Sequence, residues 1–234
     1  MKLKSLALCI ALFAFVRFDG FGQFDFVITA LNLKSNAVPH SIEGRFEKKI
    51  EPYHGGELEY YDFSNPNFDL CYYPKQLGVN CGYFTLNDQL IVLDGKYPYN
   101  LGCDLDYGSF EVFECNINKN RYLILTCIRY GSGTTTRNVY CNLFDITDPL
   151  EVQFFPLWSI YGSSHCFGDY NADGKIDFLE IRYDPEAKST DIFKLTLTTL
   201  DMKEFRREED KYIIFRREYQ REDIPRIITI EKNW

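Results

Sequence analysis

The chain has 234 residues, 26 basic and 34 acidic side chains, and a formal net charge of −8. This acidic balance repels phosphate backbones and so argues against nucleic acid as a partner. Aromatic residues make up 17% of the chain, a content that fits a large pleated core.

Residues 1–22 have the pattern of a signal peptide. Two lysines within the first four residues precede an uncharged apolar run from Ser5 to Val16, which is shorter than the roughly 20 residues that a membrane-spanning helix needs. Small residues at Gly20 and Gly22 then favour cleavage before Gln23. We expect an exported protein, located in the periplasm, at the cell surface or outside the cell. The alternative is a buried N-terminal strand or helix.

The expected mature chain, residues 23–234, lacks Lys2, Lys4, Arg17 and Asp19. It therefore keeps 23 basic and 33 acidic side chains, for a net charge of −10. Its length suits a single domain, and its apolar runs are too short to span a membrane.

Most of the mature sequence has the pattern of β-strands. Short segments rich in aromatic and β-branched residues are separated by glycine, asparagine and aspartate. The clearest of them are residues 82–95, 108–115, 121–130, 138–146, 152–158, 191–200 and 211–218. The pattern predicts one all-β domain of antiparallel hairpins or a meander, and a small or partial β-propeller is one such arrangement. At roughly 40–50 residues a blade, the mature length allows four or five blades.

The segment "DMKEFRREEDKYIIFRREYQRED", residues 201–223, is ambiguous. The sequence "FRRE" occurs twice, at Phe205 and Phe215, and a helix would place the two rings about 80° apart. We favour a charged hairpin that turns at Glu208–Asp210 over a helix.

The expected mature chain has seven cysteines, and an odd number leaves at least one thiol unpaired. If the hairpin around "RYGSGTTTRNVY" turns at Thr134, Cys127 and Cys141 lie opposite each other within disulfide range. Alternatively, both are small buried apolar residues. The simplest connectivity pairs Cys127 with Cys141, Cys71 with Cys81 and Cys103 with Cys115, and leaves Cys166 free.

The stretch "DYNADGKIDFLE", residues 169–180, matches a calcium loop. Ca²⁺ takes six to eight oxygen ligands, which such a loop supplies from positions 1, 3, 5 and 9 and from the carbonyl at 7. Gly174 at position 6 permits the sharp turn, and Ile176 at position 8 would anchor the loop in the core. The predicted ligands of one Ca²⁺ are Asp169, Asn171, Asp173, the Lys175 carbonyl and Asp177. The alternative is a plain hairpin turn at "ADG".

The flanks of this loop indicate strands instead of the helices of an EF-hand. Leu179 and Ile181 alternate with polar residues after the loop, which is a strand period. Glu180, at position 12, would point away from Leu179 and is kept as an outer ligand at most. "CFGDYNADGKIDFLEI", residues 166–181, resembles a single FG-GAP or VCBS-type repeat, the integrin-α-like motif in which a Phe-Gly pair precedes a DxDxDG loop between two strands.

This resemblance implies calcium binding and a role in adhesion or extracellular binding. We therefore expect an exported, calcium-stabilised β-domain that binds a surface protein or glycan. Two alternatives remain, a secreted polymer-degrading hydrolase and a structural or inhibitory periplasmic protein. Catalytic residues are not identified: His165 and Cys166 are adjacent and would face opposite ways in a strand, although His40 or His54 could serve a cysteine nucleophile.

Overall fold

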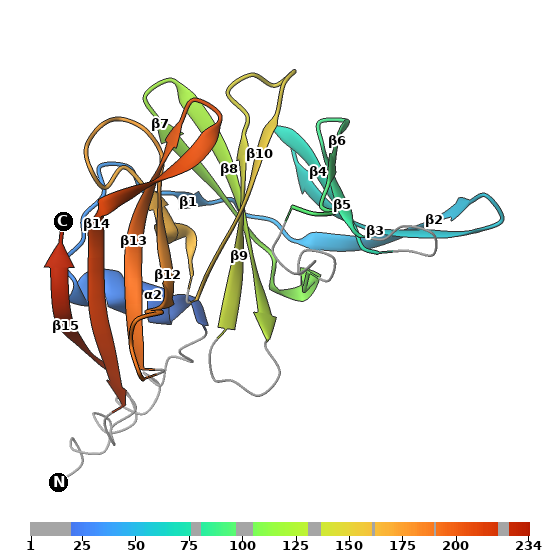
Figure 1. The fold of residues 1–234 in the computed structure, drawn as a ribbon. Coiled ribbons are helices and arrows are strands. Elements are labelled where there is room, and N and C mark those ends of the chain that lie inside the picture. The colour runs from blue at the N-terminus through green and yellow to red at the C-terminus, as the bar shows by residue number, and fades with distance from the viewer. Residues whose placement is uncertain are drawn as a thin grey trace, which may run out of the picture.

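The computed structural model describes residues 20–75, 81–96, 105–130, 137–160, 162–189, 191–219 and 225–234. These residues form three antiparallel sheets of five strands each (Figure 1). The predicted all-β fold class is confirmed. The length allowed four or five propeller blades. The described part of the chain instead forms three larger sheets, each with five strands.

The three sheets follow one another along the chain as meanders, except that β1, which precedes the N-terminal sheet, pairs with β7 at the edge of the central sheet. The N-terminal sheet, in the order β2-β3-β4-β5-β6, comprises β2 (Phe46–Tyr53), β3 (Gly56–Asn65), β4 (Phe68–Tyr73), β5 (Tyr83–Leu86) and β6 (Gln89–Val92). The central sheet, in the order β1-β7-β8-β9-β10, comprises β1 (His40–Ser41), β7 (Glu111–Ile117), β8 (Asn120–Tyr130), β9 (Arg137–Asp145) and β10 (Gln153–Ile160). The C-terminal sheet, in the order β11-β12-β13-β14-β15, comprises β11 (Phe167–Gly168), β12 (Asp177–Tyr183), β13 (Ile192–Asp201), β14 (Glu204–Tyr219) and β15 (Pro225–Asn233).

Short helical segments connect or flank these sheets. They are the α-helix α2 (Gly20–Ala30) and two single turns of 3-10 helix, η2 (Tyr107–Ser109) and η3 (Ser164–Cys166). The cleavage expected before Gln23 falls in the first turn of α2, while residues 1–19 of the predicted signal peptide lie outside the described residues. None of the described helices has the length and apolar character that crossing a membrane requires.

The central sheet is buried on both faces, because its strands alternate apolar side chains toward two separate cores. Leu123, Leu125 and Cys127 pack with the N-terminal sheet. Tyr122 and Ile124, which point the other way, pack with the C-terminal sheet and α2. The central sheet therefore lies between the other two and packs one face against each of them (Figure 1).

The predicted Cys127–Cys141 disulfide is wrong, because the register differs by one residue from the one assumed. Cys127 lies opposite Tyr140, and Cys141 lies opposite Thr126. A slip of one residue turns the two thiols to opposite faces, and each is buried in a different core.

The other predicted disulfides are also wrong, because Cys71 and Cys115 are free thiols. Cys81 is disulfide-bonded. Cys103 lies outside the described residues. Cys166 is a free, buried thiol, as predicted.

The hairpin predicted at Glu208–Asp210 is also wrong, because β14 continues through these residues as one strand. The pairing of β13 with β14 shifts here: Thr198 lies opposite Arg207, but Thr196 lies opposite Tyr212. Two steps along β13 therefore correspond to five along β14. Glu208–Asp210 therefore lie in a bulge of β14, where the side chains leave the regular alternation of the strand.

Candidate metal centre

The predicted calcium loop connects two paired strands. Phe167 of β11 lies opposite Phe178 of β12, and Gly168 lies opposite Asp177, so residues 169–176 form the hairpin loop. Phe167 and Ile176 have no exposed surface and hold the two ends of the loop in the core. The strand flanks and the anchoring role of Ile176 agree with the sequence prediction.

The segment after α2 packs tightly against the start of the loop. The Asp169 amide donates a hydrogen bond to Ser35 Oγ at 2.7 Å, and the Asn36 amide donates to the Asp169 carbonyl at 2.9 Å. A Cβ atom at Gly168 would collide with the Ser35 side chain. The glycine of the Phe-Gly pair is therefore needed for this close approach of two backbones.

Asp169, at position 1 of the loop, carries a buried oxygen without a protein partner. The residue is 7% exposed, and its Oδ1 accepts no hydrogen bond from the described residues. Such an atom is costly, because burial removes water from a polar group without replacing its hydrogen bonds. A cation at this oxygen would supply the missing interaction.

Asp177, at position 9, is fully buried. Its Oδ2 accepts hydrogen bonds from the amides of Tyr170 at 2.7 Å and Asn171 at 3.3 Å, while Oδ1 accepts one from Thr199 Oγ1 at 2.5 Å. Burial raises the pKa of Asp177 to about 6, although these hydrogen bonds act to lower it. The charged form is thus destabilised by lost hydration, and a nearby cation would favour it.

The three remaining predicted ligands lie on the outer turn of the loop. Asn171 Oδ1 accepts a hydrogen bond from the Asp173 amide at 3.0 Å, and Asp173 Oδ1 accepts one from the Lys175 amide at 2.9 Å. These bonds curl the chain tightly. The ammonium group of Lys175 contacts Asp201 at 2.9 Å, so only the Lys175 carbonyl is a candidate ligand.

Gly174 is required by its backbone and by its surroundings. Its φ of +77° lies in the left-handed region, and a Cβ atom there would lie 2.5 Å from Asn118 Nδ2. That amide nitrogen donates to the Gly174 carbonyl at 2.8 Å. The central sheet therefore supports the tip of the loop.

Sequence reasoning missed Glu208, which approaches the loop from β14. Its Oε1 accepts a hydrogen bond from Asn171 Nδ2 at 2.9 Å and lies 2.9 Å from Thr199 Oγ1, whose one proton is shared between Glu208 and Asp177. The bulge in β14 places it there, and no spacing rule in the sequence signals that placement. The acidic run "EED" is the one signal in the sequence, and it fits a turn as well as a strand.

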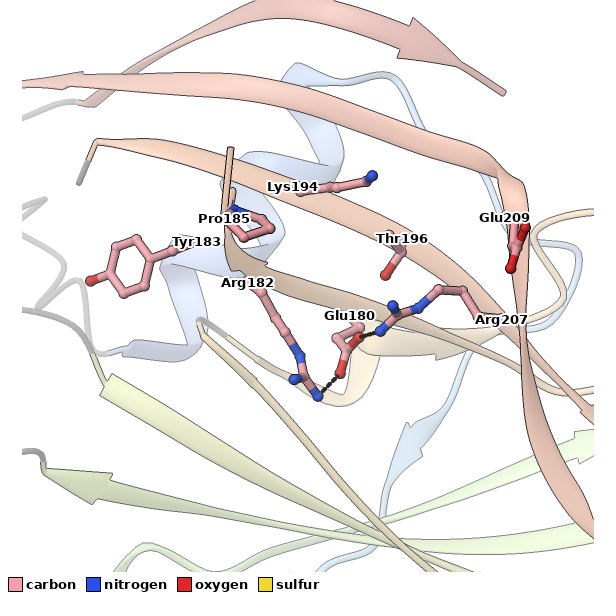
Figure 2. Close-up of a pocket in the computed structure, with 8 residues that line it drawn as sticks. All are labelled: Glu180, Arg182, Tyr183, Pro185, Lys194, Thr196, Arg207 and Glu209. Carbon is pink, nitrogen blue, oxygen red and sulfur yellow. Dashed lines mark hydrogen bonds and ion pairs between the residues drawn. The ribbon is translucent and has the colours of Figure 1, made fainter. Parts of the chain in front are cut away.

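Glu180 does not belong to this loop. Both of its carboxylate oxygens are ion-paired, one with Arg182 and the other with Arg207 at 2.8 Å. Its side chain is 9% exposed and lies in a hollow on the C-terminal sheet (Figure 2). Glu180 is therefore not an outer ligand of the loop.

The residues of the loop fit a hard cation in their chemistry. All five predicted ligand atoms are oxygens, which Ca²⁺ prefers, and one of them, Asp169 Oδ1, has no hydrogen-bond partner among the described residues. Within the described ranges, three acidic or thiol ligand atoms come within 4.8 Å of one another at a different place, Asp62, Asp69 and Cys71. The carboxylates of the loop are spread more widely than these.

The second group has different chemistry. Cys71 Sγ lies 3.6 Å from Asp69 Oδ1 and 3.8 Å from Asp62 Oδ1, so both carboxylates are within reach of its one S–H donor. Burial and the two carboxylates raise the pKa of the Cys71 thiol to about 12. The thiol therefore stays protonated, and a protonated thiol is a poor ligand for Ca²⁺.

The histidine and cysteine side chains near the loop do not form a nucleophilic pair. His165 Nδ1 lies 2.8 Å from Asp25 Oδ1, and that same oxygen accepts a hydrogen bond from Ser163 Oγ at 2.8 Å. Cys166 is fully buried, and burial raises the pKa of its thiol. The arrangement ties η3 to α2 and leaves the Cys166 thiol protonated.

Comparison of the chain with protein-family models, with curated proteins and with solved structures finds no match in any of the three.

Proposed function

We propose that the chain is an exported, calcium-stabilised β-domain that binds a surface protein or glycan. The observation that carries the calcium part is the buried, partnerless Asp169 Oδ1 at the first position of the loop. Bound Ca²⁺ would neutralise the acidic side chains that burial and mutual repulsion destabilise. Asp169, Asn171, Asp173, the Lys175 carbonyl and Asp177 would hold the ion.

The role of the ion in this proposal is structural. The loop connects β11 to β12, and Ile176 in the loop accepts a hydrogen bond from the Leu200 amide of β13 at 2.9 Å. The side chains of Asp177 in β12 and Thr199 in β13 are also hydrogen-bonded to each other. An ion in the loop would therefore stabilise the first half of the C-terminal sheet.

A row of partly buried aromatic rings on the outer face of the N-terminal sheet supports the binding role. The rings of Tyr60 and Tyr73 are stacked with centroids 5.1 Å apart, and those of Tyr73 and Tyr83 are stacked at 4.5 Å. Their sequence neighbours are buried in the core, so these three rings stand on the opposite, outer face. Val92, which is 48% exposed and lies opposite Tyr83, extends this row onto β6. Aromatic surfaces of this kind are typical of binding sites.

Calcium binding is tested directly by isothermal titration calorimetry on the mature chain. We expect one Ca²⁺ per chain with a Kd of about 10⁻⁴ to 10⁻³ M, as is usual for extracellular modules, and no binding by Asp169→Asn. Asp69→Asn is the matched control in the other acidic group. Loss of binding in Asp69→Asn alone would place the ion at Asp62, Asp69 and Cys71 and would refute the proposed loop.

Export is tested separately by sequencing the N-terminus of protein recovered from the cell envelope or the medium. We expect the sequence to begin at Gln23. Recovery of intact Met1 in those fractions, or of the protein only in the cytosol, would refute the export part of the proposal.

A further inference from the structure

A hollow of about 530 Å³ lies on the face of the C-terminal sheet over β12, β13 and β14 (Figure 2). Its size falls within the range of about 300–1,000 Å³ that is typical of small-molecule sites. Eight residues line it, and none of them is a predicted calcium ligand. The hollow is therefore a candidate site separate from the loop.

The hollow is basic, whereas the whole chain is acidic. Arg182, Lys194 and Arg207 line it together with Glu180 and Glu209, so its formal charge is +1 while that of the chain is −8. Low-dielectric walls strengthen such a local field. An anionic ligand would be attracted here although the protein as a whole repels it.

The basic groups are held in place before any ligand arrives. Glu180 pairs with both guanidinium groups, and the Arg182 guanidinium also lies over the Trp158 ring, 4.2 Å from its centroid. The Lys194 ammonium lies 4.5 Å from the centroid of the Tyr212 ring. Side chains ordered in advance lose less conformational entropy on binding.

Hydrogen-bond donors remain for a ligand. A guanidinium group carries five N–H donors, and Glu180 contacts one terminal nitrogen of each arginine. Arg182 Nε is buried, so the donors left for a ligand are the N–H groups of Arg207 and the terminal N–H groups of Arg182 that Glu180 does not contact. Two parallel N–H groups match the oxygens of a carboxylate or sulfate.

The remaining walls suit a ligand with a ring-sized body. Pro185 and Tyr183 supply apolar surface, and Thr196 supplies a hydroxyl group at the floor of the hollow. A free inorganic anion would leave most of this volume unfilled, because one water molecule occupies only about 30 Å³. We propose that the hollow binds a small acidic sugar through the guanidinium groups of Arg182 and Arg207. This inference rests on the proposed binding function and adds a second surface to it, separate from the aromatic row of the N-terminal sheet.

The test measures binding of digalacturonate, and of its neutral methyl ester, to the mature protein by titration calorimetry. We expect the acid to bind and the ester to bind at least tenfold more weakly. Arg207→Gln should weaken binding of the acid at least tenfold, and Lys194→Gln, which leaves both Glu180 ion pairs intact, by severalfold. Arg206→Gln is the matched control, because Arg206 pairs with Glu204 at 2.8 Å and with Asp201 at 3.3 Å outside the hollow.

Three outcomes would overturn the proposal: equal affinity for acid and ester, unchanged affinity in Arg207→Gln, or no binding of the acid at concentrations up to about 10 mM. Tighter binding of an acidic dipeptide would replace the sugar with a peptide ligand and would also overturn it. Melting temperatures with and without calcium are recorded on the same samples. A failure of the calcium site and a failure of the sugar site are therefore observed separately.

Discussion

The Asn171 amide donates a hydrogen bond to Glu208 Oε1 at 2.9 Å, which joins the loop before β12 to the bulge in β14. This contact brings another negative charge next to the five predicted ligands. A carboxylate near a bound cation strengthens its binding even without direct contact.

Replacement of Glu208 by Gln should therefore weaken calcium binding by about tenfold, since the side chain keeps its shape and loses its charge. Glu209→Gln is the matched control, because Glu209 is the next residue on the strand but lines the hollow (Figure 2). Calorimetric titration of both variants measures the effect. Equal weakening in the two variants would show that only the overall charge of the strand matters.

Gly174→Ala should destabilise the protein by about 2 kcal/mol, because it combines a strained backbone with a collision. The new Cβ would lie 2.5 Å from Asn118 Nδ2. Gly55→Ala is the control for the backbone alone: Gly55 has a similar φ of +82° and open space around it. We expect about 1 kcal/mol there, from urea unfolding. Similar costs at the two positions would mean that Asn118 moves aside freely.

Stability should fall as the pH rises through neutrality, because of the pair that His165 forms with Asp25. The hydrogen bond that His165 donates to the Asp25 carboxylate raises the pKa of His165 above its ordinary value of 6.5. Burial acts to raise the pKa of Asp25, but hydrogen bonds from His165 and Ser163 bring it below the ordinary value, so the carboxylate is charged in this range.

The sign follows from proton binding in the two states. The folded protein holds the His165 proton more tightly than the unfolded chain does, so the stabilisation is complete below about pH 6.5 and is lost as the pH rises through the folded-state pKa. Both side chains are nearly half exposed, which limits the effect to less than about 1 kcal/mol. Urea unfolding from pH 5.5 to 8.5 should show this decline in the wild type and in His40→Gln but a flatter profile in His165→Gln. A flat wild-type profile would contradict the prediction.

Ser159→Ala should cost about 2 kcal/mol, because it removes a buried hydrogen-bonded contact between the central and C-terminal sheets. The Ile181 amide donates to Ser159 Oγ at 2.8 Å, and the hydroxyl donates to the Ile181 carbonyl at 3.3 Å. Alanine would leave a buried amide unsatisfied. Ser64→Ala, whose hydroxyl is exposed, should change stability by less than about 0.5 kcal/mol. A similarly small change at Ser159 would mean that water replaces the lost hydroxyl.

Local sequence patterns predicted the fold class and the loop but not the longer-range geometry. Gly174 and Ile176 were identifiable because the turn and the core anchor depend on a few adjacent residues. The pairing of Cys127 depends on a register, which a shift of one residue reverses. The approach of Glu208 to Asn171 depends on a bulge 37 residues further along the chain, and its local sequence fits a turn equally well.

The central claim is that the loop binds calcium in the folded state, and the melting temperature with calcium and with chelator tests it most directly. Binding at a hundredfold excess over Kd adds about 2.7 kcal/mol, which corresponds to a rise of roughly 5–10 °C for a chain of this size. The comparison uses Asp173→Asn and a matched control, Asp148→Asn. In each residue, Oδ1 accepts a hydrogen bond from the amide two residues ahead, at 2.9 Å, which asparagine retains.

We predict that calcium raises the melting temperature of the wild type and of Asp148→Asn by the same amount and that Asp173→Asn loses most of the rise. If calcium raised none of the three melting temperatures, or raised all three equally, the loop would be an ordinary hairpin turn and the account would be wrong.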